Sequence, residues 1–523
     1  MIKPSWDDFR RLATTGTLIP VWREFLFDCD TAVTAYAKLR ASDPPDVPAR
    51  GFLLESLVGG EKWARYTFLG TAPRAAWRLH AGGRVSTWAR DTGWSEPTPV
   101  SDPLLDLDRR LRAAVPVQAP GLPRFFGGAV GYLGYDVVRY IERLDRPPRD
   151  DLGLPEAMML FTDVVLAIDN VFARAQAIAT VDVSDGPDER TLRTRYQLAI
   201  LRVEDVIRRL STTPAPAPLD VNEARADAPF ESATTRERYE RDVDRVRDYI
   251  AAGDIFQAVL SQRLTVPLEV PPLDLYRTLR SLNPSPYLYF LELDGVSLIG
   301  SSPEVLVRLE DGRVTVRPIA GTRPRGTSEE EDRTLAEELL ADEKERAEHL
   351  MLVDLGRNDV GRIARYGTVR VSSYMAIERY SHVLHIVSQV EGDLRADLSA
   401  IDVFRACFPA GTVSGAPKIR AMQILDELEP VRRGIYAGAV GYFAYDGRTM
   451  DTAIAIRTIV AEGGRAHVQV GAGIVADSVP AREYEETLAK ARALLRALRM
   501  AGGEQHIDRA GMRVEDPQAA SLR

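Results

Sequence analysis

A short repeat constrains the fold of this chain more than any other feature of its sequence. Gly128–Tyr132 reads Gly-Ala-Val-Gly-Tyr and is followed by Tyr-Asp at 135–136; the same pattern recurs at Gly438–Tyr442, with Tyr-Asp at 445–446. Apolar runs at 161–168, 314–316 and 468–470 read as strands and are interleaved with long amphipathic helices. Similar strand–turn units in both halves predict an α+β or α/β fold, with two related antiparallel β-sheets packed as a sandwich and helices on the outside. The alternative is a chance match of small residues.

The strongest break in composition divides the chain unequally. Residues 211–218 read Ser-Thr-Thr-Pro-Ala-Pro-Ala-Pro, which disfavours both helix and central strand and is typical of an exposed linker. A helical pattern precedes it over 192–210, and a capping-box pattern at Thr234 and Glu237 opens a helix after it. We therefore predict an N-terminal region over 1–210, a linker over 211–231, a C-terminal region over 232–498 and a tail over 499–523.

Composition excludes several classes of protein. The formal net charge of −9 over 523 residues, with Arg scattered among acids, gives no nucleic-acid-binding signature. Two cysteines, Cys29 and Cys407, are too few for a disulfide framework or a structural zinc site. No stretch approaches the roughly 18 apolar residues of a membrane span. We expect a cytoplasmic protein without a membrane or nucleic-acid partner.

Two acidic helices carry the clearest chemical signal. Glu345 and Glu348 lie three apart in one predicted helix, and Glu483 and Glu486 lie three apart in another, so each pair projects from one helical face. We expect Val353–Asp359 to end the first helix in a turn. If the two faces meet, four carboxylates converge, which suits a divalent cation such as Mg²⁺ holding an anionic small molecule. The alternative is two exposed acidic faces, with Glu486 paired to Lys490 four residues on.

Three further segments are candidates for a site. Gly321 and Thr322 follow a predicted strand, where backbone N–H groups and a hydroxyl suit a carboxylate, although the segment also reads as a turn followed by a solvated Arg pair. His385 lies on a predicted strand with His382 on the opposite face, and suits either proton transfer or a structural role. The loop over 407–418 is rich in Gly, Ser and Thr but lacks the order of a phosphate-binding loop.

Taken together and in this order, these segments resemble the chorismate-utilising enzymes, and among them the anthranilate synthase component I family. The resemblance covers roughly residues 15–500. It is carried by residues 254–263, 302–304, 318–322, 345–359, 411–418 and 471–486.

The resemblance implies an Mg²⁺-dependent enzyme of tryptophan biosynthesis that converts chorismate and ammonia to anthranilate and pyruvate. It implies Glu348 and Glu486 as metal ligands, with Glu345 and Glu483 assisting through water. Catalytic roles would fall to Glu304 as general acid, to His385 as a helper in aromatisation, and to Gln257, which stands where water-adding relatives carry a lysine. The implied substrate-binding residues are Gly321, Thr322, Tyr436, Arg457, Gly471, Ala472, Gly473 and Lys490.

The resemblance also implies regulation and a partner. Two segments, Leu54-Glu55-Ser56 and Pro286-Tyr287-Leu288, are similar to a feedback pocket for L-tryptophan. Neither cysteine lies in the turn motif of an amidotransferase nucleophile, so we expect a hetero-oligomer with a glutamine amidotransferase subunit that supplies ammonia.

Two other interpretations stay open. The first is aminodeoxychorismate synthase component I of the folate branch, which typically carries Lys where this chain has Ala320. The second is a non-catalytic tryptophan sensor, which does not account for Glu304, His385 and the four helix glutamates.

Overall fold

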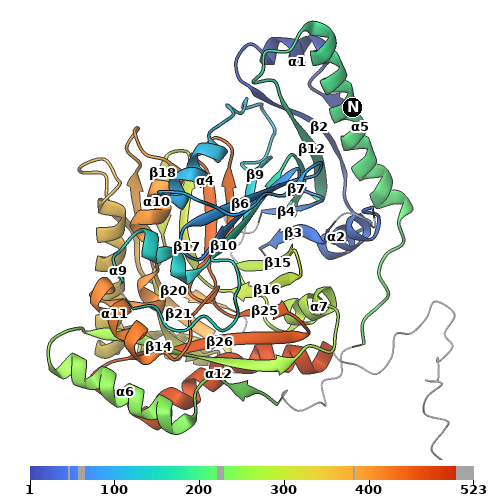
Figure 1. Ribbon diagram of the computed structural model, residues 1–523. Coiled ribbons are helices and arrows are strands. Elements are labelled where there is room, and N and C mark those ends of the chain that lie inside the picture. The colour runs from blue at the N-terminus through green and yellow to red at the C-terminus, as the bar shows by residue number, and fades with distance from the viewer. Residues whose placement is uncertain (45–47, 57–64, 145, 221–228, 381–382, 502–523) are drawn as a thin grey trace, which may run out of the picture.

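The computed structural model describes residues 1–523 apart from 45–47, 57–64, 145, 221–228, 381–382 and 502–523. In this part of the chain, two sheets of 13 strands each form the body of the molecule, and the longer helices lie outside them (Figure 1). The pairings between strands are antiparallel, which confirms the predicted sandwich of antiparallel sheets. No helix in the described ranges combines the length and apolarity that crossing a membrane takes.

The first sheet, sheet A, is continuous across both halves of the chain. Its order is β1 (Ile2–Lys3), β2 (Leu18–Leu26), β12 (Arg174–Asp182), β11 (Val164–Asp169), β4 (Tyr66–Thr71), β3 (Arg50–Glu55), β15 (Tyr287–Leu293), β16 (Val296–Ser302), β25 (Thr458–Glu462), β26 (Arg465–Ile474), β14 (Gln257–Pro267) and β13 (Glu231–Ser232), with β22 (Gly415–Ala416) paired to β14.

Sheet B is built in the same way. Its order is β19 (Ile319–Pro324), β21 (Val383–Asp393), β18 (Arg313–Val316), β17 (Val305–Glu310), β24 (Met450–Ile454), β23 (Ala439–Ala444), β9 (Gly128–Leu133), β10 (Ala157–Thr162), β5 (Ala75–His80), β6 (Arg84–Ala89) and β7 (Gly93–Trp94), with β20 (Arg370–Arg379) on β21 and β8 (Thr98–Pro99) on β6.

The repeated pentapeptide pairs with itself at the centre of sheet B. Strands β9 and β23 run antiparallel with Gly131 opposite Gly441. A Cβ on Gly131 would lie 1.9 Å from the Met158 carbonyl oxygen, and one on Gly441 would lie 2.1 Å from that of Asp451. Only glycine fits at either position, which is why the same letters recur in both halves.

Helices cover the outer faces of both sheets. Helices α2 (Ala32–Ala41), α5 (Glu189–Thr212), α7 (Pro272–Leu282), α11 (Lys418–Leu428) and α12 (Pro480–Ala501) pack on sheet A, while α9 (Glu343–Gly361) and α10 (Ala400–Cys407) pack on sheet B. The remaining helical elements are α1 (Trp6–Leu12), α4 (Pro103–Leu111), α6 (Arg236–Ala251), α8 (Glu329–Ala341) and the 3₁₀ turns η1 (Tyr135–Tyr140) and η2 (Gly411–Val413). A third apolar cluster, which includes Phe68, Tyr132 and Tyr442, joins the two sheets to each other.

Local signals place most of these helices correctly. The helix predicted over 192–210 is α5, and α6 begins at Arg236 with Thr235 rather than Thr234 as its cap. The predicted turn at 353–359 is wrong, because α9 stays helical to Gly361. The predicted linker falls between α5 and β13, but residues 221–228 lie outside the described ranges, and so does the tail beyond residue 501. Both sheets take strands from either side of the linker, so the predicted regions are not separate sheets.

Candidate active site

The acidic faces of α9 and α12 are turned toward each other. Helix α9 starts at its cap Asp342, whose carboxylate accepts hydrogen bonds from the backbone N–H of Lys344 and Glu345. Burial raises the pKa of Glu348, and the nearby carboxylates of Glu345 and Glu486 raise it further. The pKa of Glu483 on α12 is also raised, first by burial and then by Glu486. Two helices that lie far apart in the sequence thus bring their glutamates together.

These carboxylates do not form a closed cage. Glu345 pairs with Arg323 at 3.1 Å and Glu486 with Lys490 at 2.8 Å, the pairing foreseen as the alternative for Glu486. The Gln257 amide donates to Glu348 Oε1 at 3.3 Å. Among the described residues, no group of three or more His, Cys, Asp or Glu side chains is close enough to hold a metal. Glu348 and Glu486 therefore offer a partial set of hard oxygen ligands, which fits a divalent cation that also binds water and a substrate carboxylate.

The floor beside these helices is made of small residues on β26. Gly473 lies opposite Val259 of β14, and a Cβ on Gly473 would lie 2.6 Å from Gln257 Nε2. A Cβ on Gly471 would lie 2.8 Å from the Tyr436 hydroxyl oxygen. Lys490 donates to the Gly471 carbonyl oxygen at 3.0 Å. The glycines keep side chains away from this floor, while Gln257, Tyr436 and Lys490 border it.

A bulge in β19 presents the next residues. Gly321 has φ +68°, and the pairing register shifts between Ala320 and Thr322. His385 lies opposite on β21; its Nδ1 is 2.9 Å from the Gly321 carbonyl oxygen and 3.2 Å from Thr322 Oγ1. A carbonyl only accepts, so Nδ1 carries the hydrogen and Nε2 remains an acceptor. Burial lowers the pKa of His385, which keeps the ring neutral near pH 7. His382 lies outside the described residues.

Arg457 adds a half-buried cation beside this histidine. Burial lowers the pKa of its guanidinium, and the Arg457 charge also lowers the pKa of His385, which places the two side chains near each other. The described carboxylates form no ion pair with Arg457. A half-buried guanidinium of this kind fits a ligand with a carboxylate, for which its forked donors are suited.

Glu304 lies just beyond β16, at the end of Ser302-Pro303-Glu304. Its backbone carbonyl accepts from the Ile454 N–H at 3.0 Å, and its Oε1 accepts from the Thr412 hydroxyl at 3.0 Å. Burial raises the pKa of Glu304 to about 8, while the hydrogen bond from Thr412 lowers it. A carboxyl in this state keeps its proton at neutral pH and can act as a general acid. Thr412 was not among the predicted site residues, although it lies in the Gly/Ser/Thr-rich loop over 407–418.

The two segments of the predicted tryptophan pocket also meet. Leu288 pairs with Glu55 between β15 and β3, and both segments line a cavity of about 50 Å³ together with Arg124, Tyr442 and Asp451. Leu54, Ser56, Pro286 and Tyr287 of these segments also belong to the lining. The Tyr287 hydroxyl donates to Asp451 Oδ1 at 2.9 Å. The Glu55 carboxylate is held by Tyr276 and Arg280 of α7, so it anchors the pocket rather than opening into it.

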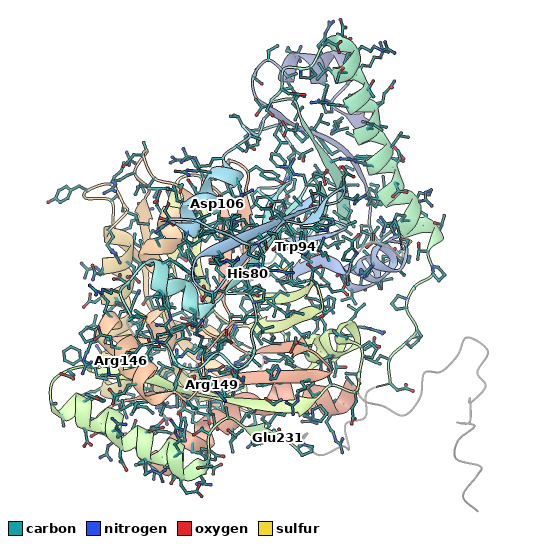
Figure 2. The ribbon with its side chains drawn as sticks, in the orientation of Figure 1. His80, Trp94, Asp106, Arg146, Arg149 and Glu231 are labelled. Carbon is teal, nitrogen blue, oxygen red and sulfur yellow. The ribbon has the colours of Figure 1, made fainter. Side chains whose placement is uncertain are left out.

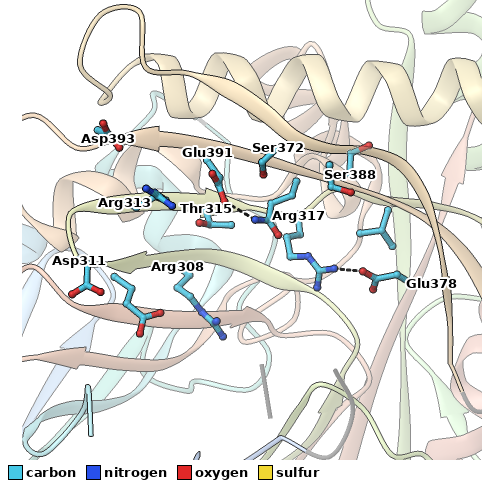
Figure 3. A pocket seen from close by; sticks show the side chains of 14 residues that line it. Arg308, Asp311, Arg313, Thr315, Arg317, Ser372, Glu378, Ser388, Glu391 and Asp393 are labelled. Atoms are coloured by element: carbon cyan, nitrogen blue, oxygen red, sulfur yellow. Dashed lines mark hydrogen bonds and ion pairs between the residues drawn. The ribbon is translucent and has the colours of Figure 1, made fainter. Parts of the chain in front are cut away.

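A larger cavity of about 790 Å³ lies on sheet B and contains none of the predicted site residues. Its polar lining includes Arg308, Arg317, Glu378 and Glu391. Figure 3 shows the ion pair between Arg317 and Glu378 and the hydrogen bond from Gln389 to Glu391. The volume of a cavity therefore does not identify the candidate active site in this structure. The convergence of acidic, basic and backbone groups identifies it.

Known proteins resemble this chain over nearly all of its length. The model of a chorismate binding enzyme family matches residues 64–496. Anthranilate synthase component 1 of Pseudomonas putida is 51% identical over 499 residues, covering 95% of this chain and 98% of the relative. The protein of the same name from Pseudomonas aeruginosa is 50% identical over 509 residues, covering 96% of this chain and 99% of the relative.

Solved structures agree. Anthranilate synthase component I from Streptococcus pneumoniae superposes with a TM-score of 0.72 at 36% identity, covering 90% of this chain and 99% of the other. The Escherichia coli isochorismate synthase MenF superposes with a TM-score of 0.64 at 19% identity, covering 94% of this chain and 98% of the other, and shows the shared fold alone.

Proposed function

The chain belongs to the chorismate-binding enzyme family, within its anthranilate synthase component I group, and on that premise we propose that it converts chorismate and ammonia to anthranilate and pyruvate. The observation that carries the proposal is Glu304, a buried carboxyl that keeps its proton at neutral pH. Eliminating a hydroxyl needs such an acid, because hydroxide is a poor leaving group.

The side chains around Glu304 divide the chemistry among them. Arg457 and the Thr322 hydroxyl bind the carboxylates of chorismate, with the glycines of β26 leaving room for them. Ammonia adds at C2 beside Gln257, while Glu304 gives its proton to the departing C4 hydroxyl. The free Nε2 of His385 then accepts the ring proton as pyruvate leaves and the ring becomes aromatic.

Mg²⁺ is the proposed cofactor. Glu348 and Glu486 would hold it directly and Glu345 and Glu483 through water, and it would neutralise substrate carboxylate charge beside these acids. Support for this assignment comes from the half-buried Glu348, whose pKa is raised by partial burial and by the charges of Glu345 and Glu486.

A glutaminase partner is the proposed source of ammonia. Burial strongly raises the pKa of the Cys407 thiol, and the adjacent Asp28 raises that of Cys29. Neither thiol is activated as a nucleophile, so this chain is expected to use ammonium and to ignore glutamine without the partner.

L-tryptophan is the proposed inhibitor, bound between β3 and β15. A cavity of about 50 Å³ is smaller than the pockets of several hundred Å³ that ligands usually occupy, so binding requires Tyr287 and its neighbours to move. That movement supplies the differential affinity that feedback needs.

One incubation tests the catalytic proposal. Purified chain with chorismate, MgCl₂ and ammonium at alkaline pH is expected to yield anthranilate and pyruvate, and EDTA is expected to stop the reaction. Formation of aminodeoxychorismate would favour the folate-branch interpretation, which Ala320 disfavours. Tryptophan binding without turnover of chorismate would favour the sensor.

A further inference from the structure

A small cavity lined by Glu304, called the passage below, lies between that residue and α9. It has a volume of about 40 Å³ and is walled by α9, the end of α10, the 410–412 segment and the end of β18. Leu355 and Gly356 in its wall are partly exposed, so the passage approaches the molecular surface there. A cavity of this size holds at least one water molecule, since about 10–15 Å³ is enough for one.

One face of α9 joins the passage to the acidic site. Glu345 and Glu348 are followed on that face by Leu352 and Gly356, in steps of three or four residues. Asp359 ends the series, buried and ion-paired with Lys418 at 3.0 Å. The face is therefore acidic beside the substrate site, apolar along the passage and charged again at its end.

The loop opposite α9 fits closely. A Cβ on Gly411 would lie 2.2 Å from Leu355 Cδ2, so the loop and the helix are in close contact here. This approach puts the neighbouring Thr412 within hydrogen-bond distance of Glu304. Both residues line the passage.

Proton balance gives the passage a task. In the proposed reaction, Glu304 gives a proton to the C4 hydroxyl, the C4–O bond breaks with its electrons going to oxygen, and one water forms. The added nitrogen loses one proton, and the Glu304 carboxylate must regain one before the next turnover. Among the described residues, Thr412 is the hydrogen-bond partner of the Glu304 carboxyl, and a hydroxyl that starts with its own proton cannot supply a net one.

We propose that this passage lets the water formed at C4 leave the site and lets a proton return from solvent to Glu304. The inference rests on the proposed function. Water in the passage is the proposed carrier, because water relays protons along hydrogen bonds and Leu352, Leu355 and Cys407 in the wall cannot.

Cys407 allows the passage to be narrowed without touching substrate. It lines the passage at the end of α10, is buried and has an inert thiol. Cys407→Leu is expected to lower kcat about tenfold while KM for chorismate stays within about twofold, since chorismate binding is untouched. The solvent deuterium isotope effect on kcat is expected to rise, because proton return becomes slower. Cys407→Ala, which widens the passage, is expected to keep the parental kcat.

A matched control separates blockage from overpacking. Ala406 is buried beside Cys407 but does not line the passage. Ala406→Leu is expected to lower the melting temperature as Cys407→Leu does, yet to leave kcat unchanged. If Cys407→Leu fails to fold, Leu352→Phe narrows the same passage from α9.

The outcomes are distinct. Parental kcat in a folded narrowing variant would overturn the proposal, and so would an equal loss of kcat in Ala406→Leu or in Cys407→Ala. Failure of the parent to make anthranilate from chorismate and ammonium would instead refute the proposed function.

Discussion

The two halves of this molecule share one plan, but only the C-terminal half carries the candidate active site. From the junction of β3 and β15, sheet A runs outward as β4, β11, β12, β2 and β1 on one side, and as β16, β25, β26, β14 and β13 on the other. Sheet B is arranged in the same way around β9 and β23, with Gly131 facing Gly441. The halves are thus related by an approximate two-fold axis.

The halves differ most in the segments that come after the outer strands of sheet B. In the N-terminal half, β6 leads through the short β7 and β8 to α4, whereas in the C-terminal half β18 leads through residues 319–393 before α10. That longer segment contains β19, α8, α9, β20 and β21, and it carries Gly321, Thr322, Glu345, Glu348 and His385. Part of the candidate site therefore lies on a segment much longer than its N-terminal counterpart, and the rest lies on the shared scaffold.

Smaller exchanges close the equivalent place in the N-terminal half. Ala72-Pro73-Arg74 connects β4 to β5, and Ser302-Pro303-Glu304, whose first residue ends β16, leads to β17 in the same way. Strand β12 begins at Arg174 and β26 begins at Arg465. Counted from these residues, Asp182 of β12 corresponds to Gly473 of β26. Arg74 and Asp182 pair at 4.0 Å. The N-terminal half therefore has an ion pair at the positions where the C-terminal half has Glu304 and Gly473.

The inner faces of sheet B also differ. In the N-terminal half, the Arg50 guanidinium lies 3.8 Å from the centre of the Trp88 ring and pairs with Asp294 at 2.6 Å. Figure 2 labels Trp94 in this region, where its indole N–H donates to Asp294. The corresponding face of β17 and β18 presents Arg308 and Thr315 to the cavity of Figure 3.

Removing one site carboxylate is expected to have the largest effect. Glu348→Gln deletes a negative charge that we assign to Mg²⁺ binding and should lower kcat/KM by about a thousandfold, or roughly 4 kcal/mol. Glu189→Gln, in the first turn of α5, the helix that follows β12 as α12 follows β26, should keep parental activity. Steady-state assays with an Mg²⁺ titration, alongside circular dichroism, check both. Comparable turnover by the two variants would contradict the conclusion that only the C-terminal half carries the active site.

Glu304→Gln is expected to lower kcat about a hundredfold, because a general acid is lost. It should also change the pH dependence of stability. The pKa of Glu304 is near its ordinary 4.5 when unfolded and about 8 when folded, so the native state binds the extra proton between these values. Stability of the parent then falls as pH rises through this window, by at most about 1.4 kcal/mol per pH unit.

Urea unfolding at pH 5 and pH 8 measures this dependence. The variant lacks the titrating group, so its stability relative to the parent should increase between the two pH values. Arg74→Gln at the equivalent N-terminal position should show no such trend. Parallel pH profiles for the parent and Glu304→Gln would contradict the raised pKa.

Ser56→Phe is expected to weaken inhibition by tryptophan about tenfold, because its bulk enters the pocket between β3 and β15. Activity without tryptophan should stay within about twofold of the parent, since the site residues are untouched. Inhibition curves at fixed chorismate measure the shift. An unchanged curve would place the regulatory pocket elsewhere.

Trp88→Ala is expected to leave kcat and KM unchanged and to act on stability alone. Removing a buried indole costs about 3 kcal/mol, since Trp-to-Ala changes in cores fall in this range. Thr315→Ala, on the corresponding strand β18, should cost less than about 1 kcal/mol. Denaturant unfolding compares the two. A fall in kcat for Trp88→Ala would show that the packing of Trp88 in the N-terminal half also positions the active-site residues.

Local patterns predicted a large part of this molecule. Helical spacing identified the paired glutamates, and the i,i+4 pairing of Glu486 with Lys490 is present at 2.8 Å. The repeat indicated two related sheets. Its self-pairing could not be read from the sequence, because strand partners hundreds of residues apart leave no local signal. The same holds for Thr412 beside Glu304 and for Arg323 beside Glu345, which meet only through the fold. The turn predicted at 353–359 was wrong because Gly356 packs within a helix, 3.1 Å from Val316 when given a Cβ.

The continuity of both sheets across the linker has a consequence for how the polypeptide can be divided. The junctions of β3 with β15 and of β9 with β23 join segments from opposite sides of Pro214–Pro218. A half expressed alone would present two unpaired edge strands, a surface prone to aggregation. Co-expressed halves would satisfy those edges in each other. The molecule is thus a natural candidate for a split reporter, in which recovery of enzymatic turnover reads out the meeting of two fragments.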